Sequence, residues 1–295
     1  MKIRLSRSDL IYYFVAYAVV IALVLIVLYP MLFIVSASFS TAASVTAGRV
    51  WFLPVKPTLY NYKMVLQYRS IYIGYRNTLF YTFAGTFINV VITLLCAYPL
   101  SRKGLFGRGF FTFLFTFTMI FSGGMIPSYI LMRNLRLINT VWAMLLPGAI
   151  GVTNMIVTRT FFQNSIPVEL LEASKLDGCS DTQYFMRVVL PLSNAVIAVI
   201  TLFYAVGHWN SYFNAFLYLS NRNLYPLQLF LRQILVQNQF SSDIIDDPEM
   251  AEQLLGIQEV LKYAVIVVST APLMCFYPFA QKHFTKGVMI GSLKG

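Results

Sequence analysis

The sequence predicts an all-α integral membrane protein with six transmembrane helices. Of its 295 residues, 58% are hydrophobic and only 11% are charged, and its mean hydropathy is +0.68. Soluble globular domains usually place charge on about a quarter of their residues. Six runs lack Asp, Glu, Lys and Arg, and each has close to or more than the roughly 20 apolar residues that a crossing helix needs. These runs are 11–38, 77–100, 109–132, 137–158, 190–219 and 263–281.

The runs leave too little polar sequence between them for a separate soluble domain, so 1–295 is expected to be a single transmembrane domain. The first run follows Lys2, Arg4 and Arg7, as the apolar part of a signal peptide would. It is much longer than the roughly 7–15 residues of such a segment, which favours an uncleaved anchor. It also lacks the polar face of a helix that lies on the membrane surface.

Orientation is predicted from the short connection between the second and third runs. Arg102, Lys103 and Arg108 crowd it, and short cationic loops favour the cytoplasmic side. An even number of crossings then puts both termini in the cytoplasm. Breakers interrupt several runs, notably Ser122-Gly123-Gly124 and Pro147-Gly148. They could kink helices around a path, or reflect the general abundance of Gly and Pro in membrane helices.

Missing groups exclude several functions. Apart from His208, the runs contain no Asp, Glu, Lys, Arg or His, whereas proton- and sodium-coupled transporters usually place such side chains inside the membrane. Proton or sodium coupling is therefore not expected. No GxxxxGK[ST] phosphate loop is present, so energy for active transport would come from another polypeptide. The 22 Lys and Arg are spread over the loops, which favours anchoring to membrane lipid over binding of nucleic acid.

Catalysis is not expected either. With His208 and His283 as the only histidines and no carboxylates in the runs, neither a hydrolytic triad nor a metalloenzyme site can be assembled. Cys96, Cys179 and Cys275 show no metal-ligand spacing. We therefore predict no catalytic residue and no metal site.

The connection 159–189 is the most informative segment and reads as two short helices separated by a stop. Pro167 suits the first helical position, Glu169 favours the first turn, and Gly178 can adopt the left-handed conformation that ends a helix. Ser180 or Asp181 can cap the second helix. The first helix could dock a partner outside the bilayer, or be an ordinary surface helix.

This segment carries a resemblance to a known family. Glu172-Ala173-Ser174-x-x-Asp177-Gly178-Cys179, followed by Phe185 and Leu190-Pro191, resembles the EAA coupling motif of binding-protein-dependent ABC importer permeases. Ser174 and Cys179 stand where the family pattern has Ala, and both are small. The similarity extends to the MalG-like carbohydrate subfamily, in its complex oligosaccharide branch, through Asn139-Thr140-x-Trp142-Ala143, Gly207-His208-Trp209-Asn210 and Tyr225-Pro226-Leu227-Gln228.

The resemblance implies a type I ABC importer (MetI-like) permease fold in a bacterial cytoplasmic membrane. Expected partners are a second permease subunit, as a heterodimer, two ATP-binding subunits and an extracytoplasmic solute-binding protein that delivers an oligosaccharide. The chain would bind no cofactor, because ATP and Mg belong to the partner ATPase. Contact with that ATPase falls on Glu172, Ala173, Ser174, Asp177, Gly178 and Cys179, and on Lys286, Gly287, Gly291 and Ser292 of the C-terminal tail.

The fifth run mixes aromatic faces with hydrogen-bonding groups, a combination that suits sugars. The candidate residues for a solute path are Tyr204, His208, Trp209, Asn210 and Asn214. An interfacial aromatic belt, or hydrogen bonding between helices, would use the same residue types.

The predicted outer segments differ in charge. Segment 220–262 holds six acids and could dock the binding protein, whereas the first outer loop has five cations and no acid, namely Arg49, Lys56, Lys63, Arg69 and Arg76. A basic entrance could favour an acidic oligosaccharide, or it could anchor to lipid headgroups and pair with an acidic partner. A permease for another solute, a passive channel and a membrane enzyme remain the alternatives.

Overall fold

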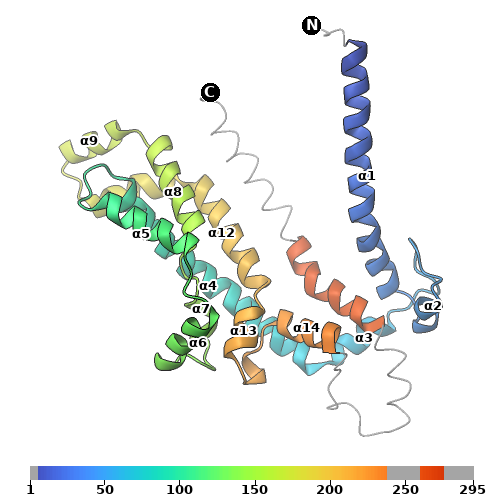
Figure 1. The fold of residues 1–295 in the computed structure, drawn as a ribbon. Helices are drawn as coiled ribbons and strands as arrows, with labels where there is room; N and C mark the ends of the chain where they lie inside the picture. Colours follow the sequence, from blue (N-terminus) through green and yellow to red (C-terminus); the bar gives the residue numbers. More distant parts are fainter. Residues whose placement is uncertain (1–5, 238–259, 276–295) are drawn as a thin grey trace. The chain divides into compact units, whose positions relative to one another are not determined.

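A computed structural model describes residues 6–237 and 260–275, and within these ranges the regular elements are helices (Figure 1). The chain divides into two compact units. One comprises Met1–Arg69 and Leu231–Ala271, and the other comprises Ser70–Phe230 and Pro272–Gly295.

The first unit contains α1 (Arg7–Ser38), α2 (Ala42–Thr46) and α3 (Tyr60–Gln67). Apolar side chains cover all sides of α1 and are exposed along its length, as expected of a helix that faces lipid. The end of α1 is tied to α3, because Nδ2 of Asn61 donates to the carbonyl oxygens of Ser38 and Ser40 at 3.0 and 2.9 Å. Phe33 also packs edge-on against Tyr263, with ring centroids 5.6 Å apart.

The second unit is organised around α4 (Arg69–Ser101), whose 33 residues span about 50 Å at ~1.5 Å per residue. The other helices of eight or more residues in this part of the chain are α5 (Arg108–Ile120), α6 (Met125–Asn134), α8 (Val152–Ser165), α9 (Val168–Leu176), α12 (Asn194–Trp209) and α14 (Leu227–Gln237). Shorter turns are α7 (Trp142–Leu145), α10 (Asp181–Tyr184), the π-helical η1 (Phe185–Val189), α11 (Leu190–Leu192), α13 (Phe213–Tyr218) and the 3₁₀ turn η2 (Arg222–Leu224).

Several predicted crossings are broken. The run 109–132 was expected to form one helix, but α5 and α6 meet at 115° across 121–124, where Gly124 has φ +84°. The run 137–158 is divided between α7 and α8, with Gly148 at φ +73° between them, and α8 continues beyond the predicted end to Ser165. Segment Asp181–Leu192 and α12 likewise meet at an angle of 79°.

The described residues therefore contain two helices that are long and apolar enough to cross a membrane, or up to four if each bent pair is one span. The sixth run begins within a helix at Val260–Cys275, and 276–281 lies outside the described residues. The number of six crossings stays a prediction.

Asn139 secures the connection that follows α13. Its φ is +61°, a left-handed conformation that Asn tolerates better than most residues. From there, Oδ1 accepts hydrogen bonds from the N–H groups of Ser220 and Asn221 at 3.2 and 2.8 Å, and the Asn139 N–H donates to the carbonyl of Tyr218 at 2.8 Å. The Asn139 motif thus has a structural role.

Side chains of α4 also fix the connection that follows α13. Nδ2 of Asn77 donates to the carbonyl oxygens of Asn223 and Tyr225 at 2.7 and 2.9 Å. The hydroxyl of Thr78 accepts from the N–H of Leu227 at 2.8 Å. The 225–228 motif is therefore fixed against the first half of α4.

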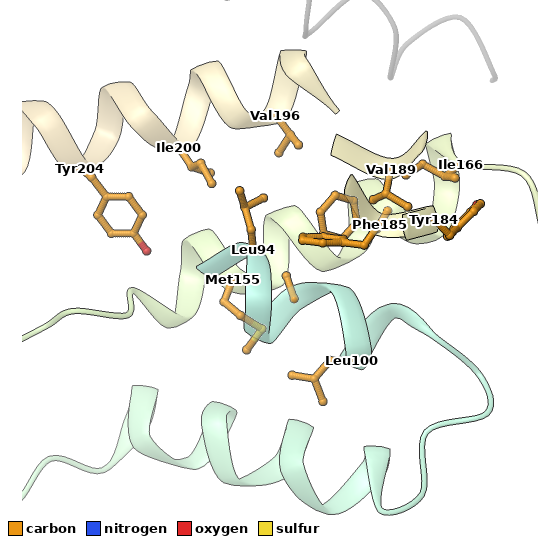
Figure 2. Close-up of a cluster of buried hydrophobic side chains, with 12 residues drawn as sticks. Leu94, Leu100, Met155, Ile166, Tyr184, Phe185, Val189, Val196, Ile200 and Tyr204 are labelled. Carbon is orange, nitrogen blue, oxygen red and sulfur yellow. The ribbon is translucent and has the colours of Figure 1, made fainter. Parts of the chain in front are cut away.

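A buried apolar cluster joins α4, α8 and α12 to the segment after α9 (Figure 2). Ile200 and Val189 are fully buried within it, and Tyr184 is 1% exposed. Figure 2 shows Val196, Ile200 and Tyr204 along one face of α12. Ile166 before α9 and Tyr184 after it both belong to this cluster, so the two ends of the α9 segment are anchored in the packed interior of the second unit.

Candidate functional site: the α9 surface and a polar pocket

Local signals at both ends of α9 define its shape. Pro167 was predicted at the first helical position but is the N-cap residue, and α9 begins one residue later, at Val168. At the other end Gly178 has φ +75°, its N–H bonds to the carbonyl of Lys175, and the N–H of Cys179 bonds to the carbonyl of Ser174 at 2.9 Å. This pair of bonds is a Schellman motif, so the predicted stop at Gly178 is confirmed.

Ser180 begins the next helix, as one of the two predicted caps. Its Oγ accepts from the N–H of Gln183 at 3.3 Å, and Oε1 of Gln183 accepts from the N–H of Ser180 at 3.1 Å. These two bonds form a capping box. Together with the Schellman motif, this capping box fixes the backbone between α9 and α10.

The predicted coupling residues divide by exposure. Glu172, Ala173, Asp177 and Gly178 are exposed. Ser174 is 8% exposed, and its hydroxyl donates to the carbonyl of Leu171 at 2.9 Å; Cys179 is half-buried. Ser174 and Cys179 are therefore less available than the other four residues for contact with a partner.

Sequence reasoning missed two apolar members of this surface. Leu176 is 90% exposed and Val168 is 55% exposed. They share a helix face with Glu172 at four-residue spacing, and this spacing could have identified them. We call Val168, Glu172, Ala173, Leu176 and Asp177 the α9 surface. Figure 1 shows α9 at one end of the second unit, away from α13. An exposed apolar surface of this kind suits docking to a partner.

A pocket of about 220 Å³ lies in the second unit, beside the second half of α12. Its lining residues are Asn89, Met144, Pro147, Gly148, Phe203, Tyr204, Gly207, His208, Ser211 and Asn214. No Asp, Glu, Lys or Arg is among them. The pocket therefore offers neutral hydrogen-bonding groups and apolar surface.

Three of the five predicted path residues, Tyr204, His208 and Asn214, line this pocket. Trp209 does not, because it is 5% exposed and its ring lies 6.4 Å from that of Tyr75. Asn210 is exposed outside the pocket, and its Nδ2 donates to the carbonyl of Val206 at 3.0 Å.

The hydroxyl of Tyr204 is already used by the protein. It lies 2.7 Å from Oγ1 of Thr93 and accepts from the N–H of Gly151 at 3.0 Å. Tyr204 therefore ties α12 to α4 and to the start of α8, and it offers the pocket its ring more than its hydroxyl.

Asn89 is a pocket residue that sequence reasoning missed, although an amide in the run 77–100 is a visible signal. It is 4% exposed, and Oδ1 has no hydrogen-bond partner among the described residues. The same is true of Nε2 of His208. Buried polar atoms in this state call for a water or a ligand. His208 also lies against Gly85 of α4, where an added Cβ would overlap the imidazole ring.

The chain matches the family described as binding-protein-dependent transport system inner membrane component over residues 89–290. It is 41% identical over 280 residues to the polygalacturonan/rhamnogalacturonan transport system permease protein YtcP of Bacillus subtilis (strain 168), covering 95% of this chain and 96% of that protein. Protein LplC of the same organism is 40% identical over 270 residues, covering 92% and 90%.

A solved structure is also similar, with a TM-score of 0.88 and 36% identity, covering 96% of this chain and 100% of that chain. It is the crystal structure of a bacterial ABC transporter involved in the import of the acidic polysaccharide alginate.

The helical fold and these relatives define a membrane-embedded permease and not an enzyme. The chain belongs to the family of binding-protein-dependent transport system inner membrane components. The predicted fold class and the resemblance to ABC importer permeases are confirmed.

Proposed function

We propose that this chain is one permease subunit of an ATP-driven importer that moves an oligosaccharide delivered by an extracytoplasmic solute-binding protein. Energy enters at the α9 surface from a separate ATPase, which holds the ATP and Mg, while this chain binds no cofactor. The observation that carries the proposal is the exposed Val168, Glu172 and Leu176 on a helix with both ends fixed.

The assembly we propose has two permease subunits, as a heterodimer, and two ATP-binding subunits. Both chain termini lie in the cytoplasm, on the same side as α9. The tail residues Lys286, Gly287, Gly291 and Ser292, proposed as a further ATPase contact, lie outside the described residues. So does most of the acidic segment proposed to dock the binding protein.

The pocket supports an oligosaccharide cargo. Sugar hydroxyls need directed donors and acceptors, and Asn89, His208, Ser211 and Asn214 line the pocket with side chains of this kind. The Tyr204 ring can pack on a sugar C–H face. The relatives' names point the same way, since YtcP is named for polygalacturonan and rhamnogalacturonan transport.

Replacing Leu176 with Asp tests the docking proposal. Full burial of a Leu side chain contributes about 1.5–3 kcal/mol, so Leu176→Asp should weaken association with the ATPase by roughly tenfold or more. The measurement is the amount of ATPase that co-purifies from a membrane extract containing the native partners, together with ATP-dependent uptake into vesicles.

Asn164→Asp, at an exposed position on α8, adds the same charge and serves as the matched control. Equal loss in both variants would exclude a specific α9 contact. A wild-type chain that never associates with an ATP-binding subunit would exclude the importer, and ATP-independent flux would favour a passive channel.

A second candidate property is preference for an acidic cargo. Arg49, Lys56, Lys63, Arg69 and Arg76 are all exposed in the structure, and positive potential concentrates anions near an entrance. The similar solved transporter is involved in the import of the acidic polysaccharide alginate.

Neutralising Arg49 and Lys63 to Gln tests this preference. With the complete transporter in vesicles, we expect uptake of a uronic oligosaccharide to fall severalfold and to lose part of its salt dependence, because screening weakens exposed charges. Uptake of a neutral oligosaccharide of the same length should change little. An equal fall for both cargoes would instead indicate that the cations pair with an acidic partner or anchor to lipid.

A further inference from the structure

Arg102 lies between two aromatic rings from separate parts of the second unit. Its guanidinium carbon is 4.7 Å from the centroid of the Tyr98 ring on α4 and 5.2 Å from that of Tyr184 on α10. Both distances are within the range of a cation–π interaction. Tyr184 is 1% exposed, so this contact is made inside the packed cluster that supports α9.

The charge of Arg102 is otherwise poorly compensated. Nε and Nη2 are buried and have no hydrogen-bond partner among the described residues, and the hydroxyl of Tyr184 is in the same condition. With two of its three nitrogens in this state, the guanidinium is held mainly by Tyr98 and Tyr184. Loss of either ring is expected to loosen its position.

The last turn of α4 also needs outside support. Pro99 lies inside the helix and has no N–H to donate, which weakens the connection of this turn to the preceding one. Nε of Arg108 and Nε of Arg159 both donate to the carbonyl of Leu100 at 3.0 Å. The turn that carries Arg102 is thus held from α5 and α8, and from α10 by Tyr184.

The other contacts of α4 reach the pocket. Thr93 bonds to the hydroxyl of Tyr204, Asn89 lines the pocket, and Gly85 lies against His208. From Asn89 to Arg102 is about 20 Å along a helix, at ~1.5 Å per residue. The α4 segment therefore has contacts at both places. Arg102 at its C-terminal end contacts Tyr184 beside the α9 segment, and Asn89 lines the proposed solute pocket.

We propose that Arg102 is a positioning residue that couples the α9 segment to α4 by its contact with Tyr98 and Tyr184. Displacement of α9 and α10 then moves the end of α4, and α4 carries the change to Asn89 and Gly85 at the pocket. This inference rests on the proposed function, because it assumes that the ATPase acts at the α9 surface.

The test uses the complete importer, with its ATPase, partner permease and binding protein, in lipid vesicles. The measured quantity is the number of oligosaccharide molecules imported per ATP hydrolysed. Coupling between sites typically corresponds to ~5–150-fold effects, so Arg102→Ala should lower this ratio by about fivefold or more while the complex still assembles and hydrolyses ATP. Arg102→Lys should recover part of the ratio, because an ammonium can still face a ring.

Tyr184→Leu should lower the ratio as Arg102→Ala does, and the double variant should be no worse than either single one. Tyr184→Phe keeps the ring and should retain the wild-type ratio. Lys103→Ala, at the exposed neighbouring position, is the matched control. If Arg102→Ala does not assemble, the two Tyr184 variants decide the matter.

A merely structural role would lower assembly, uptake and hydrolysis together and leave the ratio unchanged, which would overturn the proposal. Additive losses in the double variant, or equal ratios for Tyr184→Leu and Tyr184→Phe, would also overturn it. Failure of the proposed function would be seen differently, as wild-type vesicles without ATP-dependent uptake.

Discussion

Replacing Gly85 with Ala is expected to reduce both the stability of the protein and its uptake activity. In an ordinary helix this change is favourable by about 1 kcal/mol. Here the new Cβ would overlap the His208 imidazole, so α4 and α12 would have to separate or the ring would have to turn. Overpacking of this kind typically costs ~1–3 kcal/mol. Thermal unfolding in detergent and uptake into vesicles measure the two effects.

The double variant Gly85→Ala, His208→Ala separates packing from solute contact. Removing the imidazole removes the overlap, so the unfolding temperature should return toward that of wild type. If His208 contacts the solute, uptake should stay low in the double variant. Gly109→Ala on α5, where a Cβ meets nothing within 4 Å, should lower neither quantity. An unfolding temperature for Gly85→Ala equal to that of wild type would contradict the close approach.

Replacing Gly178 should impair energy coupling with little effect on the amount of folded protein. Nothing lies within 4 Å of a Cβ at this position, so the cost comes from φ +75° alone. An L-residue in this conformation costs about 1–2 kcal/mol, less for Asn and more for a β-branched residue. Uptake should therefore fall in the order Gly178→Asn, Gly178→Ala, Gly178→Val, with at least a tenfold loss for Val.

Gly104→Ala is the matched control, because its Cβ also meets nothing within 4 Å and its φ is not in the left-handed range. It should behave as wild type. Equal uptake for Gly178→Asn and Gly178→Val would show that the Schellman end of α9 is not needed. Loss of folded protein in proportion to uptake would assign Gly178 to stability.

Short-range signals were sufficient where the chain's own chemistry decides the structure. The stop at Gly178 and the cap at Ser180 follow from residue types, since left-handed backbone favours Gly and N-caps favour Ser. The long apolar helices α1 and α4 were likewise predicted within a few residues, apart from the extension of α4 back to Arg69. Length and hydropathy alone determine these.

Other features depend on contacts between distant residues. The Gly residues at 123–124 predicted only that a kink was possible, and the angle of 115° between α5 and α6 could not be derived from residue types. Residue types also could not separate His208 from Trp209. Tyr204 and His208 share a helix face by spacing, while Trp209 lies about 100° from His208 around the helix. That Asn89 of α4 and His208 of α12 line the same pocket is visible only in three dimensions.

The π-helical turn η1, between α10 and α11, has a consequence for the evolution of the chain's length. A π turn accommodates one residue more than an α turn, and both Phe185 and Val189 of this turn are buried. Loss of a single residue from this turn would restore an α-helix and rotate the preceding segment by about 100°. The α9 surface would keep its sequence and its shape but face another direction, so under the proposed function a one-residue deletion at this place would redirect the docking helix without changing any residue of its surface.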